Sequence, residues 1–381
     1  MTAETTAIYL DYNATAKVRP EAVAAMVRAL ELTGNPSSAH ASGRAAHAAM
    51  ETARAEVATL AGAVPAAVTF LSGGAEANAL AIDSAMTAGF TRLIIGALEH
   101  DTVRETALAG GWPVAIWPVD GDGVADLAWL ERQLAAGGKG RPLVCLMLAN
   151  NETGVIQPVA EASALVRAAG GWLHVDAVQA AGKIAIDIEA LGADTLSLSA
   201  HKIGGPQGVG ALLAGSRATI ARQLHGGGQE RGRRAGTENV PGIAAFGAAA
   251  KAALAGLPRL AADTVGRDAF EAAVVAAGAE VLGIRAPRLQ QTSCFAAPGF
   301  ASELQVISLD LAGVRVSAGA ACSSGKVKAS PVVAAMGRED LAPFSIRVSG
   351  GWATTAAEWS RCADAWLKLN ERRAARRLEV A

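Results

Sequence analysis

Two residues stand out because they are nucleophilic and do not have the surroundings of ordinary surface side chains. Lys202 leaves a mostly apolar stretch, Leu196–Ala200, and enters a glycine turn, which is an unusual place for a solvated charge. A lysine in this position is suited to attack an aldehyde, and a purely structural lysine is equally compatible with the pattern. Cys322 lies among small residues, and Lys326 and Lys328 favour its thiolate, the form that acts as a nucleophile.

Three further segments offer groups that can hold a cofactor. The turn 72–78 contains two glycines before a predicted helix, so its backbone N–H groups suit a phosphate, although an ordinary glycine turn has the same pattern. His100 is either a structural histidine or a ring that stacks on a cofactor and moves protons. Asp176 follows an apolar run, where it is either a helix cap or the partner of a pyridinium nitrogen.

Two polar loops complete the set of candidate segments. The segment 148–154 carries amides, Asn151 among them, that can contact a ring substituent or cap a turn. The basic, glycine-rich segment 226–237 either reaches a phosphate or is a solvated surface loop. Each segment is ambiguous by itself. Together they place a phosphate turn, a ring-side histidine, an acidic partner, a lysine and a cysteine in the order that a fold binding pyridoxal 5′-phosphate (PLP) needs.

The elements that must position these residues alternate between short apolar runs and amphipathic stretches. This pattern predicts an α/β domain with a largely parallel sheet, in which ligands bind at the carboxyl ends of the strands. The helix expected first, Pro20–Leu30, has Val23, Met26, Val27 and Leu30 on one face. Two more helices are predicted at Ala75–Met86 and Val159–Ala169. The predicted strands are Val68–Leu71, Arg92–Ala97, Val114–Pro118, Leu143–Leu148, Trp172–Val175, Thr195–Ser199 and Val209–Leu213.

The rhythm changes after Gly256 to longer helices with a few strands. We therefore predict two domains. Residues 14–255 form a large PLP-binding domain, and residues 256–381, together with 1–13, form a smaller α+β domain that carries the Cys322 loop.

Composition excludes several classes of protein. The 381 residues have a formal net charge of −1, which argues against a nucleic-acid-binding protein. The most alanine-rich run, Gly242–Leu257, is interrupted by Gly247 and Lys251, so we expect no membrane-spanning stretch and no membrane partner. The start of the chain lacks the pattern of a signal peptide, which predicts a cytoplasmic protein. No cysteine has metal-ligand spacing, and three of the four are predicted to be buried: Cys145, Cys294 and Cys362.

In these motifs the chain resembles the cysteine desulfurases of the NifS/IscS type, within the fold-type I (aspartate aminotransferase-like) PLP enzymes. The match extends from Tyr9 to about Thr355. Its most specific segments are GNPSSAH (34–40), EH (99–100), NNETGV, HVDAVQ, SLSAHKIGGPQGVG, GGGQERGRRAGTEN, GAACSSG and SIRVSGG.

The resemblance implies a role for each matching residue around the cofactor ring. Lys202 would hold PLP covalently, and His100 would stack on the ring. Asp176 would pair with the pyridine nitrogen, and Gln179 would contact the ring hydroxyl with Asn151 nearby. The residues around the phosphate would be Gly74, Ala75, Ser199 and His201.

The resemblance also implies a substrate site, a subunit arrangement and a sulfur acceptor. Arg347 would bind the carboxylate of the substrate L-cysteine, assisted by Asn35. Thr237 would reach the phosphate in the other subunit of a homodimer. Cys322 would take the sulfur as a persulfide, leave alanine, and pass the sulfur to an acceptor protein such as an iron–sulfur cluster scaffold. Nitrogenase maturation, housekeeping clusters and tRNA thiolation are all compatible destinations.

Some positions depart from the pattern of the family. Ala75 stands where threonine is common, which removes a hydroxyl contact to the phosphate; Ala79 stands where asparagine is common and Gln229 where many relatives have histidine. The residues after Cys322 read SSGKVKAS, which bears on partner docking more than on the chemistry. Two rival interpretations stay open: another fold-type I enzyme, such as an aminotransferase or a selenocysteine lyase, and a silent PLP-fold scaffold protein.

Overall fold

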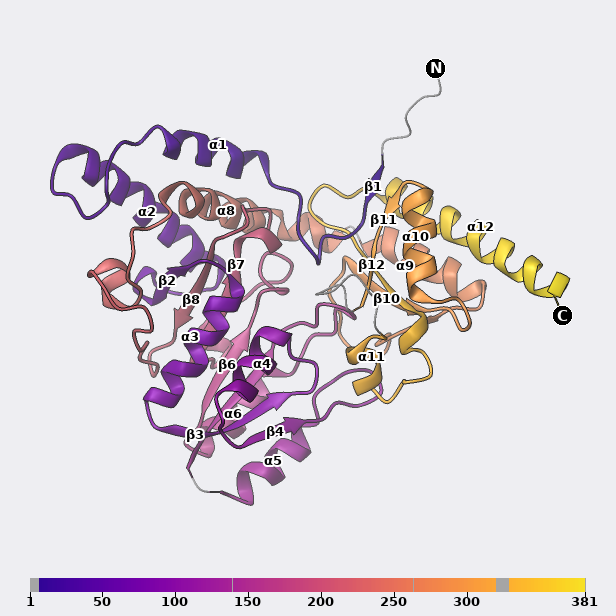
Figure 1. The fold of residues 1–381 in the computed structure, drawn as a ribbon, viewed down its shortest axis with the longest axis horizontal. Helices are drawn as coiled ribbons and strands as arrows, with labels where there is room; N and C mark the ends of the chain where they lie inside the picture. The colour runs from indigo at the N-terminus through magenta and orange to yellow at the C-terminus, as the bar shows by residue number, and fades with distance from the viewer. Residues whose placement is uncertain (1–6, 139, 263, 320–328, 381) are drawn as a thin grey trace.

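The computed structural model describes residues 7–138, 140–262, 264–319 and 329–380. Two bodies of secondary structure lie side by side, one built around a large sheet and one around a small sheet (Figure 1). The strands are β1 (Ile8–Tyr9), β2 (Val68–Leu71), β3 (Phe90–Gly96), β4 (Val114–Trp117), β5 (Arg141–Met147), β6 (Trp172–Asp176), β7 (Thr195–Ser199), β8 (Gly210–Ala214), β9 (Glu280–Val281), β10 (Thr292–Ala296), β11 (Val314–Arg315), β12 (Ser317–Ala318) and β13 (Ser345–Ser349).

Helices cover both bodies. They are α1 (Pro20–Leu30), α2 (Ala41–Leu60), α3 (Gly74–Thr87), α4 (Asp101–Ala109), α5 (Leu127–Ala135), α6 (Val159–Ala168), α7 (Ile188–Leu191), α8 (Val240–Ala262), α9 (Thr264–Ala276), α10 (Ser302–Leu311), α11 (Pro331–Ala335) and α12 (Ala356–Val380). Four 3-10 turns are η1 (Pro65–Ala67), η2 (Ala200–Lys202), η3 (Gln229–Gly232) and η4 (Ala342–Phe344).

The large sheet has seven strands in the order β2-β8-β7-β6-β5-β3-β4. β4, β3, β5, β6 and β7 run parallel, and β8 runs antiparallel to both of its neighbours, β7 and β2. This confirms the predicted α/β class with a largely parallel sheet. All seven predicted strands are present, with ends that differ from the expected ones by at most two residues.

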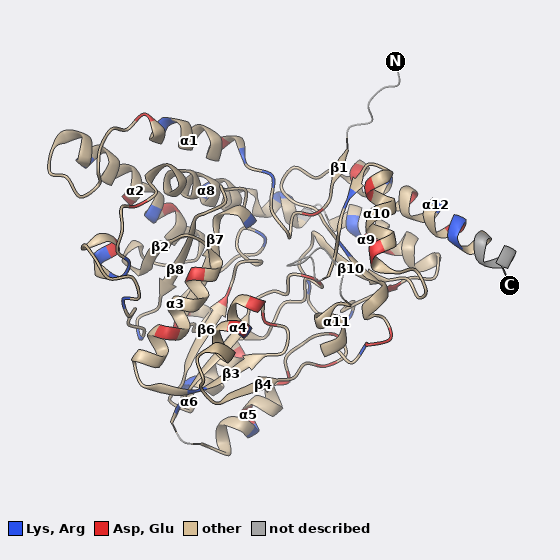
Figure 2. Ribbon diagram, in the orientation of Figure 1, with Lys and Arg blue, Asp and Glu red and all other residues tan. Residues whose placement is uncertain are grey.

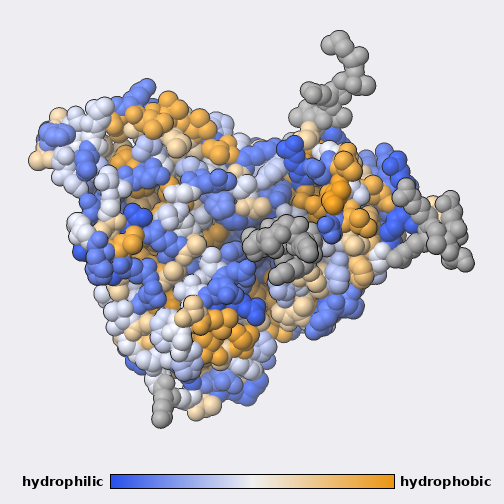
Figure 3. Space-filling view, in the orientation of Figure 1, coloured by the Kyte–Doolittle hydropathy of each residue, from blue (hydrophilic) through white to orange (hydrophobic). Residues whose placement is uncertain are grey.

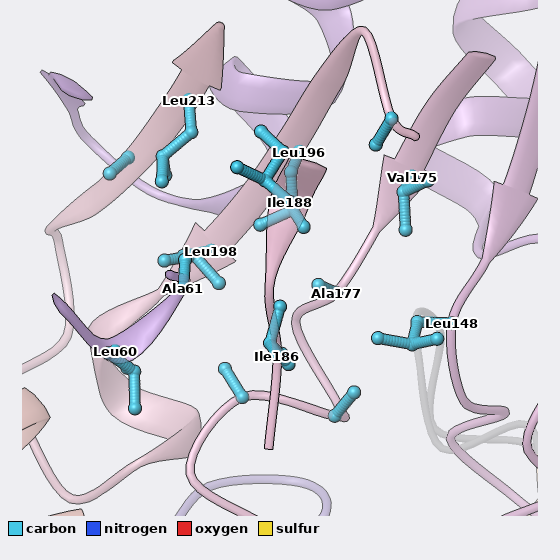
Figure 4. Packing of buried hydrophobic residues seen from close by; sticks show 14 of the residues in the cluster. Leu60, Ala61, Leu148, Val175, Ala177, Ile186, Ile188, Leu196, Leu198 and Leu213 are labelled. Carbon is cyan, nitrogen blue, oxygen red and sulfur yellow. The ribbon is translucent and has the colours of Figure 1, made fainter. Parts of the chain in front are cut away.

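The largest apolar cluster of the large body lies on one face of this sheet, and a second cluster, which includes Leu93, Leu143 and Cys145, lies on the other. Leu196 and Leu198 on β7 point to the same side as Val175 on β6, and their side chains pack with Ile188 of α7 (Figure 4). Burying a side chain of this size stabilises the fold by about 1.5–3 kcal/mol. The alternate positions of the same strands face the other way and are polar, as the two-residue period of a strand requires: His174, Asp176, Thr195, Ser197 and Ser199.

Helix α1 has the predicted bounds, but its packing face differs from the apolar face seen in the sequence. Ala22, Ala25 and Ala29 are buried where α1 packs on α8. Val23 and Leu30 are 49% and 64% exposed. Figure 3 shows a hydrophobic patch over α1. Small alanines permit a close approach of two helices, which explains why they, and not the larger side chains, form the contact.

The small sheet has the order β12-β13-β10-β9 and has its own apolar core, which includes Phe270, Phe295 and Trp366. The start of the chain joins this body, because β1 pairs in parallel with β11 (Ile8 with Val314). Helix α8 runs through residues 255 and 256 without interruption. The predicted division into two domains at that point therefore stays a prediction.

Helix α8 contains the alanine-rich run noted in the sequence. Residues Val240–Ala261 are long and apolar enough to cross a membrane by length and composition, with a mean hydropathy of 1.5. In the described chain this helix packs against α1 and α2, and half of the apolar segment is buried inside the protein. A helix in the core of a protein meets the same length and composition criteria as a membrane-spanning helix. The packing of α8 against α1 and α2 therefore accounts for its alanine-rich composition.

Acidic and basic residues are interspersed over the described part of the chain (Figure 2).

Candidate active site

A cavity of about 580 Å³ opens where the parallel strands end and the two bodies meet. Its volume lies within the range of ordinary small-molecule sites, about 300–1,000 Å³. It brings together ten of the residues predicted from the sequence: Gly74, Ala75, His100, Asn151, Asp176, Gln179, Ser199, His201, Lys202 and Arg347.

The amino-terminal end of α3 forms one wall of the cavity and is suited to an anion. Gly73 precedes the helix and no side chain of the described residues caps it, so among them the first N–H groups of α3 remain available at the cavity. The neighbouring strand requires glycine here, because a Cβ on Gly210 would lie 2.6 Å from the Gly73 backbone. Ser199 and His201 line the same cavity. Burial, assisted by the charge of Lys202, lowers the pKa of His201 to about 4, so its ring is neutral at pH 7.

Lys202 ends the short turn η2, directly after β7. Its Nζ donates hydrogen bonds to the backbone oxygens of Asn13 and Ala14, at 2.6 and 2.9 Å. Lys183 lies on the other side of Asn13, and its Nζ donates to Asn13 Oδ1 at 3.2 Å and to Gln179 Oε1 at 2.7 Å. Burial and the nearby positive charges hold the pKa of Lys183 well below its usual range.

Asp176 is a buried carboxylate at the carboxyl end of β6. One of its oxygens accepts the backbone N–H of Val178 at 2.9 Å, and the other accepts a side-chain N–H of Asn78 at 2.8 Å. Each of its two oxygens therefore has an N–H donor within the protein. An ionised carboxylate at this cavity can hold a cationic ring nitrogen.

His100 caps the amino terminus of α4. Its Nδ1 accepts the backbone N–H of Thr102 at 3.1 Å and lies 3.0 Å from the Thr102 hydroxyl. The histidine therefore has a structural bond on one ring nitrogen, while its ring lines the cavity. The structural and the cofactor-related interpretations of this residue are both compatible with this position.

Arg347 lies on β13 and brings a buried positive charge from the small body into the cavity. Its guanidinium donates to Asp11 at 2.7 Å and to the backbone oxygen of Asn151 at 3.0 Å. Asp11 also accepts the hydroxyl of Ser317 on β12, at 2.7 Å. Asp11 thus connects the arginine to the strand that precedes residues 320–328.

Ser330, which follows residues 320–328 in the sequence, contacts Glu152, the neighbour of the cavity residue Asn151. Ser330 begins α11 as its cap and donates its hydroxyl to Glu152 at 2.6 Å. A Cβ on Gly319 would lie 2.1 Å from the same Glu152 carboxylate, so a larger residue there would require the Glu152 side chain to move. Cys322 lies outside the described residues. The other three cysteines are buried as predicted, and burial raises the thiol pKa of Cys145 and Cys294, and that of Cys362 to about 12.

Two predicted site residues do not line this cavity within their own chain. Asn35 is exposed and its side chain accepts the N–H of Ser37 in a local turn. Thr237 is exposed on the basic loop. The arginines of that loop bind their own chain: Arg233 donates to the Ala66 carbonyl, and Arg234 pairs with Glu76 of α3.

A buried ion pair fixes the base of the same loop. Glu230 accepts two hydrogen bonds from Arg54, both at 2.8 Å, and a third from the backbone N–H of Phe70. Glu230 and Arg231 have φ values of 48° and 58°, which is unusual for residues other than glycine. The ion pair offsets the cost of this backbone conformation.

Sequence inspection missed three residues that organise the site: Asn13, Asn78 and Thr102. Asn13 contacts Lys202, Lys183 and Gln179, and its Nδ2 also donates to the Thr292 hydroxyl at 3.0 Å. Asn13 was placed with the small body, and Asn78 was treated only as part of the glycine turn. The available signal for Asn78 was its place at the start of a helix directly after the glycine turn.

The chain is similar to proteins whose activity is recorded in their names. The family model described as Aminotransferase class-V matches residues 8–361. A cysteine desulfurase of Cereibacter sphaeroides is 43% identical, with 93% of each chain covered, and the cysteine desulfurase IscS of Dictyoglomus turgidum is 37% identical over 96% of this chain and 95% of the relative. The structure of a NifS-like protein from Rickettsia africae superposes with a TM-score of 0.88 at 32% identity, covering 96% of this chain and 99% of that one.

Proposed function

This chain belongs to the class-V aminotransferase family and, within it, to the cysteine desulfurases, and we propose that it removes the sulfur of L-cysteine and releases L-alanine. One observation carries the proposal. A single cavity contains an amine, a buried carboxylate and a buried guanidinium, the three groups that cofactor and substrate would need: Lys202, Asp176 and Arg347.

The family depends on PLP, and the cavity fits this cofactor. The uncapped amino terminus of α3, lined by Gly74 and Ala75, suits the phosphate. Lys202 lines the same cavity and suits the aldehyde, and the carboxylate of Asp176 suits the pyridine nitrogen. The proposed contacts of His100, Gln179 and the other predicted residues are supported by their place in this lining.

Bound PLP would supply an aldehyde carbon for the substrate amine and a ring that withdraws electrons from the substrate Cα. Arg347 would orient the substrate by binding its carboxylate through two N–H groups. The guanidinium would then be shared between the substrate and Asp11, to which it donates a hydrogen bond in this structure. Lys202, once its place is taken by the substrate amine, would remove the Cα proton with its Nζ. Asp176 would keep a proton on the ring nitrogen throughout.

We place the sulfur transfer at Cys322. Its thiolate would attack the substrate sulfur, so that an S–S bond forms and the Cβ–S bond breaks with its electron pair left on the carbon skeleton. Proton uptake by that skeleton gives alanine, and Cys322 keeps the sulfur as a persulfide. The persulfide sulfur would then pass to an acceptor protein such as an iron–sulfur cluster scaffold.

We further propose that the enzyme works as a homodimer in the cytoplasm. Thr237 and Asn35 support the dimer, because both are exposed and neither lines the cavity of its own chain. A second subunit that places its Thr237 beside the phosphate would give this residue a function.

The experiment that tests the function incubates the PLP-loaded protein with L-cysteine and a reductant, and measures alanine and sulfide. The Cys322→Ala variant should lose both products, while Cys362→Ala, at a buried cysteine in the small-body core, should keep them. Equal turnover by Cys322→Ala and the parent would exclude Cys322 as the acceptor. Alanine that forms only with a keto acid present would favour an aminotransferase, and no turnover by either protein would favour a silent scaffold.

A further inference from the structure

Asn78 connects Asp176, the residue expected at the ring nitrogen, to Thr102, which contacts His100, the residue expected to stack on the ring. It is 1% exposed, on the second turn of α3. One of its side-chain N–H groups donates to Asp176 at 2.8 Å and the other to the hydroxyl of Thr102 at 2.9 Å. Its Oδ1 lies 3.0 Å from Nε2 of His174. All the polar atoms of this side chain are therefore engaged.

The chemistry of these partners fixes the direction of every hydrogen bond. An ionised carboxylate only accepts, so the Asn78 nitrogen must face Asp176 and its oxygen must face His174. His174 must then carry its proton on Nε2. Its Nδ1 accepts from the hydroxyl of Thr195, which lies 2.9 Å away. His174 is fully buried, and burial lowers its pKa to about 4, so it is neutral in this arrangement.

Asn78 also acts on His100, through the hydroxyl of Thr102. Because the Thr102 oxygen accepts from Asn78, its hydroxyl hydrogen is available to His100 Nδ1 at 3.0 Å, where the Thr102 backbone N–H also points. Two donors at Nδ1 leave no room for a proton on that atom. The His100 ring is therefore neutral with its proton on Nε2, the nitrogen that is left for the cavity.

Other titratable groups act on Asp176 from the neighbouring strands. Glu99 follows β3, and burial and the charge of Asp176 raise its pKa to about 8, so it is uncharged at pH 7. Cys145 on β5 is a buried thiol with a raised pKa. Both are neutral, as is His174, and the hydrogen-bond donors to Asp176 are the Asn78 side chain and the Val178 N–H. The cations Lys202 and Arg347 line the same cavity as Asp176.

We propose that Asn78 is the positioning residue of the site: it keeps Asp176 ionised and oriented towards the ring nitrogen, and through Thr102 it keeps His100 neutral with the proton on Nε2. This inference rests on the proposed function, because it assigns a task to the expected PLP-binding residues. Asn78 touches neither the cofactor nor the substrate in this role.

The test compares three variants of the full chain by PLP affinity, by the pH midpoint of the visible absorption of bound PLP, and by kcat. Asn78→Asp replaces both donors with an acceptor beside Asp176. The two carboxylates then share a proton and a single negative charge, so part of the charge that faces the ring nitrogen is removed from Asp176. We expect the PLP dissociation constant to rise about tenfold or more and the absorption midpoint to move upward by about one pH unit. Asn78→Ser, which stays neutral, should change both in the same direction by less.

Thr102→Val distinguishes the effect of Asn78 on His100, which passes through Thr102, from its direct effect on Asp176. It removes the hydroxyl that orients His100 and leaves the bond from Asn78 to Asp176. We expect PLP affinity and the absorption midpoint to stay within about twofold and a few tenths of a pH unit of the parent, while kcat falls several-fold. The control, Asn370→Asp, changes an asparagine of α12 that donates to the Ala277 carbonyl far from the cavity, and it should leave all three quantities unchanged.

Parent-like affinity and midpoint in the folded Asn78→Ser protein would overturn the proposal, as would a Thr102→Val protein whose absorption midpoint moves as far as that of Asn78→Asp. Circular dichroism identifies a variant that has not folded, and the Asn78→Ser result then decides. A parent protein that binds no PLP would contradict the proposed function instead, so the two failures are distinguishable.

Discussion

Arg347 and Asp11 form an ion pair at 2.7 Å across the edge of the cavity, joining β13 to the segment that follows β1. The arginine side chain is 4% exposed, so the pair lies largely out of solvent. A substrate carboxylate that binds Arg347 must share it with Asp11. Asp11 also holds Ser317, so occupancy of the arginine bears directly on the strand that leads towards Cys322.

Arg347→Lys should weaken substrate binding with little change in PLP binding. Lysine keeps the charge but cannot hold Asp11, Asn151 and a substrate carboxylate with one planar fork. We expect KM for L-cysteine to rise about 10–100-fold, the equivalent of one charged hydrogen bond. Steady-state alanine formation measures this. The control, Arg338→Lys, changes an arginine paired with Glu280 away from the cavity, and a KM that rises equally there would contradict the assignment.

Ala75→Thr should tighten PLP binding. Ala75 lines the cavity at the first turn of α3, and the resemblance places a threonine hydroxyl beside the phosphate at this position. One added hydrogen bond should lower the PLP dissociation constant about two- to tenfold. Titration of the stripped enzyme with PLP measures the change. Ala79→Thr, one turn further along and outside the cavity lining, should leave the constant unchanged, and equal affinities for both variants would exclude a phosphate contact.

Glu99→Gln should remove the part of the pH dependence of the free energy of unfolding that comes from Glu99. Burial raises the pKa of Glu99 to about 8 in the folded protein, compared with 4.5 in an exposed chain. Between these values the folded state binds the additional proton, so the free energy of unfolding falls as the pH rises, by up to about 5 kcal/mol. Above about pH 8 this loss is complete.

Urea unfolding across that range measures the effect. As the pH rises from 4.5 to about 8, the free energy of unfolding of the parent should fall relative to that of Glu99→Gln. Above about pH 8 the difference between the two free energies should be constant. Glu303→Gln, at an exposed position on α10, should follow the parent at every pH. Parallel curves for the parent and Glu99→Gln would mean that Glu99 is charged in the folded protein.

Glu230→Gln should destabilise the fold far more than Glu51→Gln, although both carboxylates bind Arg54. Glu230 is buried with the arginine, and its loss leaves a buried charge without its main partner, at a cost of about 3–5 kcal/mol. The Glu51 side chain is 34% exposed, and its removal should cost about 1 kcal/mol or less. Denaturant midpoints measure both. Equal losses would show that burial does not decide the strength of these pairs.

The elements of the large sheet were predictable because each strand is a short apolar run bounded by turn residues. Thr195–Ser199 and Pro20–Leu30 have the predicted bounds. The orientation of α1 was not predictable, because the sequence shows that Val23 and Leu30 share a face but not that the alanine face fits against α8. Which face is buried depends on the surface that a helix meets, and that surface is far away in the sequence.

The site, too, depends on contacts between residues that are far apart in the sequence and that the sequence does not reveal. Residues at strand ends, such as Lys202 and Asp176, follow from the rule that ligands bind at the carboxyl ends of parallel strands. The contacts that hold them do not follow, because Asn13 meets Lys202 across 189 residues and Asn78 meets Asp176 across 98. A side chain with several donors and acceptors has many possible partners in a sequence, and only the packed structure selects among them.

The parallel pairing of β1 with β11 has a consequence for how the protein is made. Ile8 leaves the ribosome about three hundred residues before its partner Val314. The large sheet can form while translation continues, since β2 to β8 lie between residues 68 and 214. The first strand must wait, and with it Asp11 and Asn13, which hold Arg347 and Lys202. The cavity is therefore completed only after synthesis of the carboxyl-terminal third, so a nascent chain cannot acquire the catalytic arrangement early.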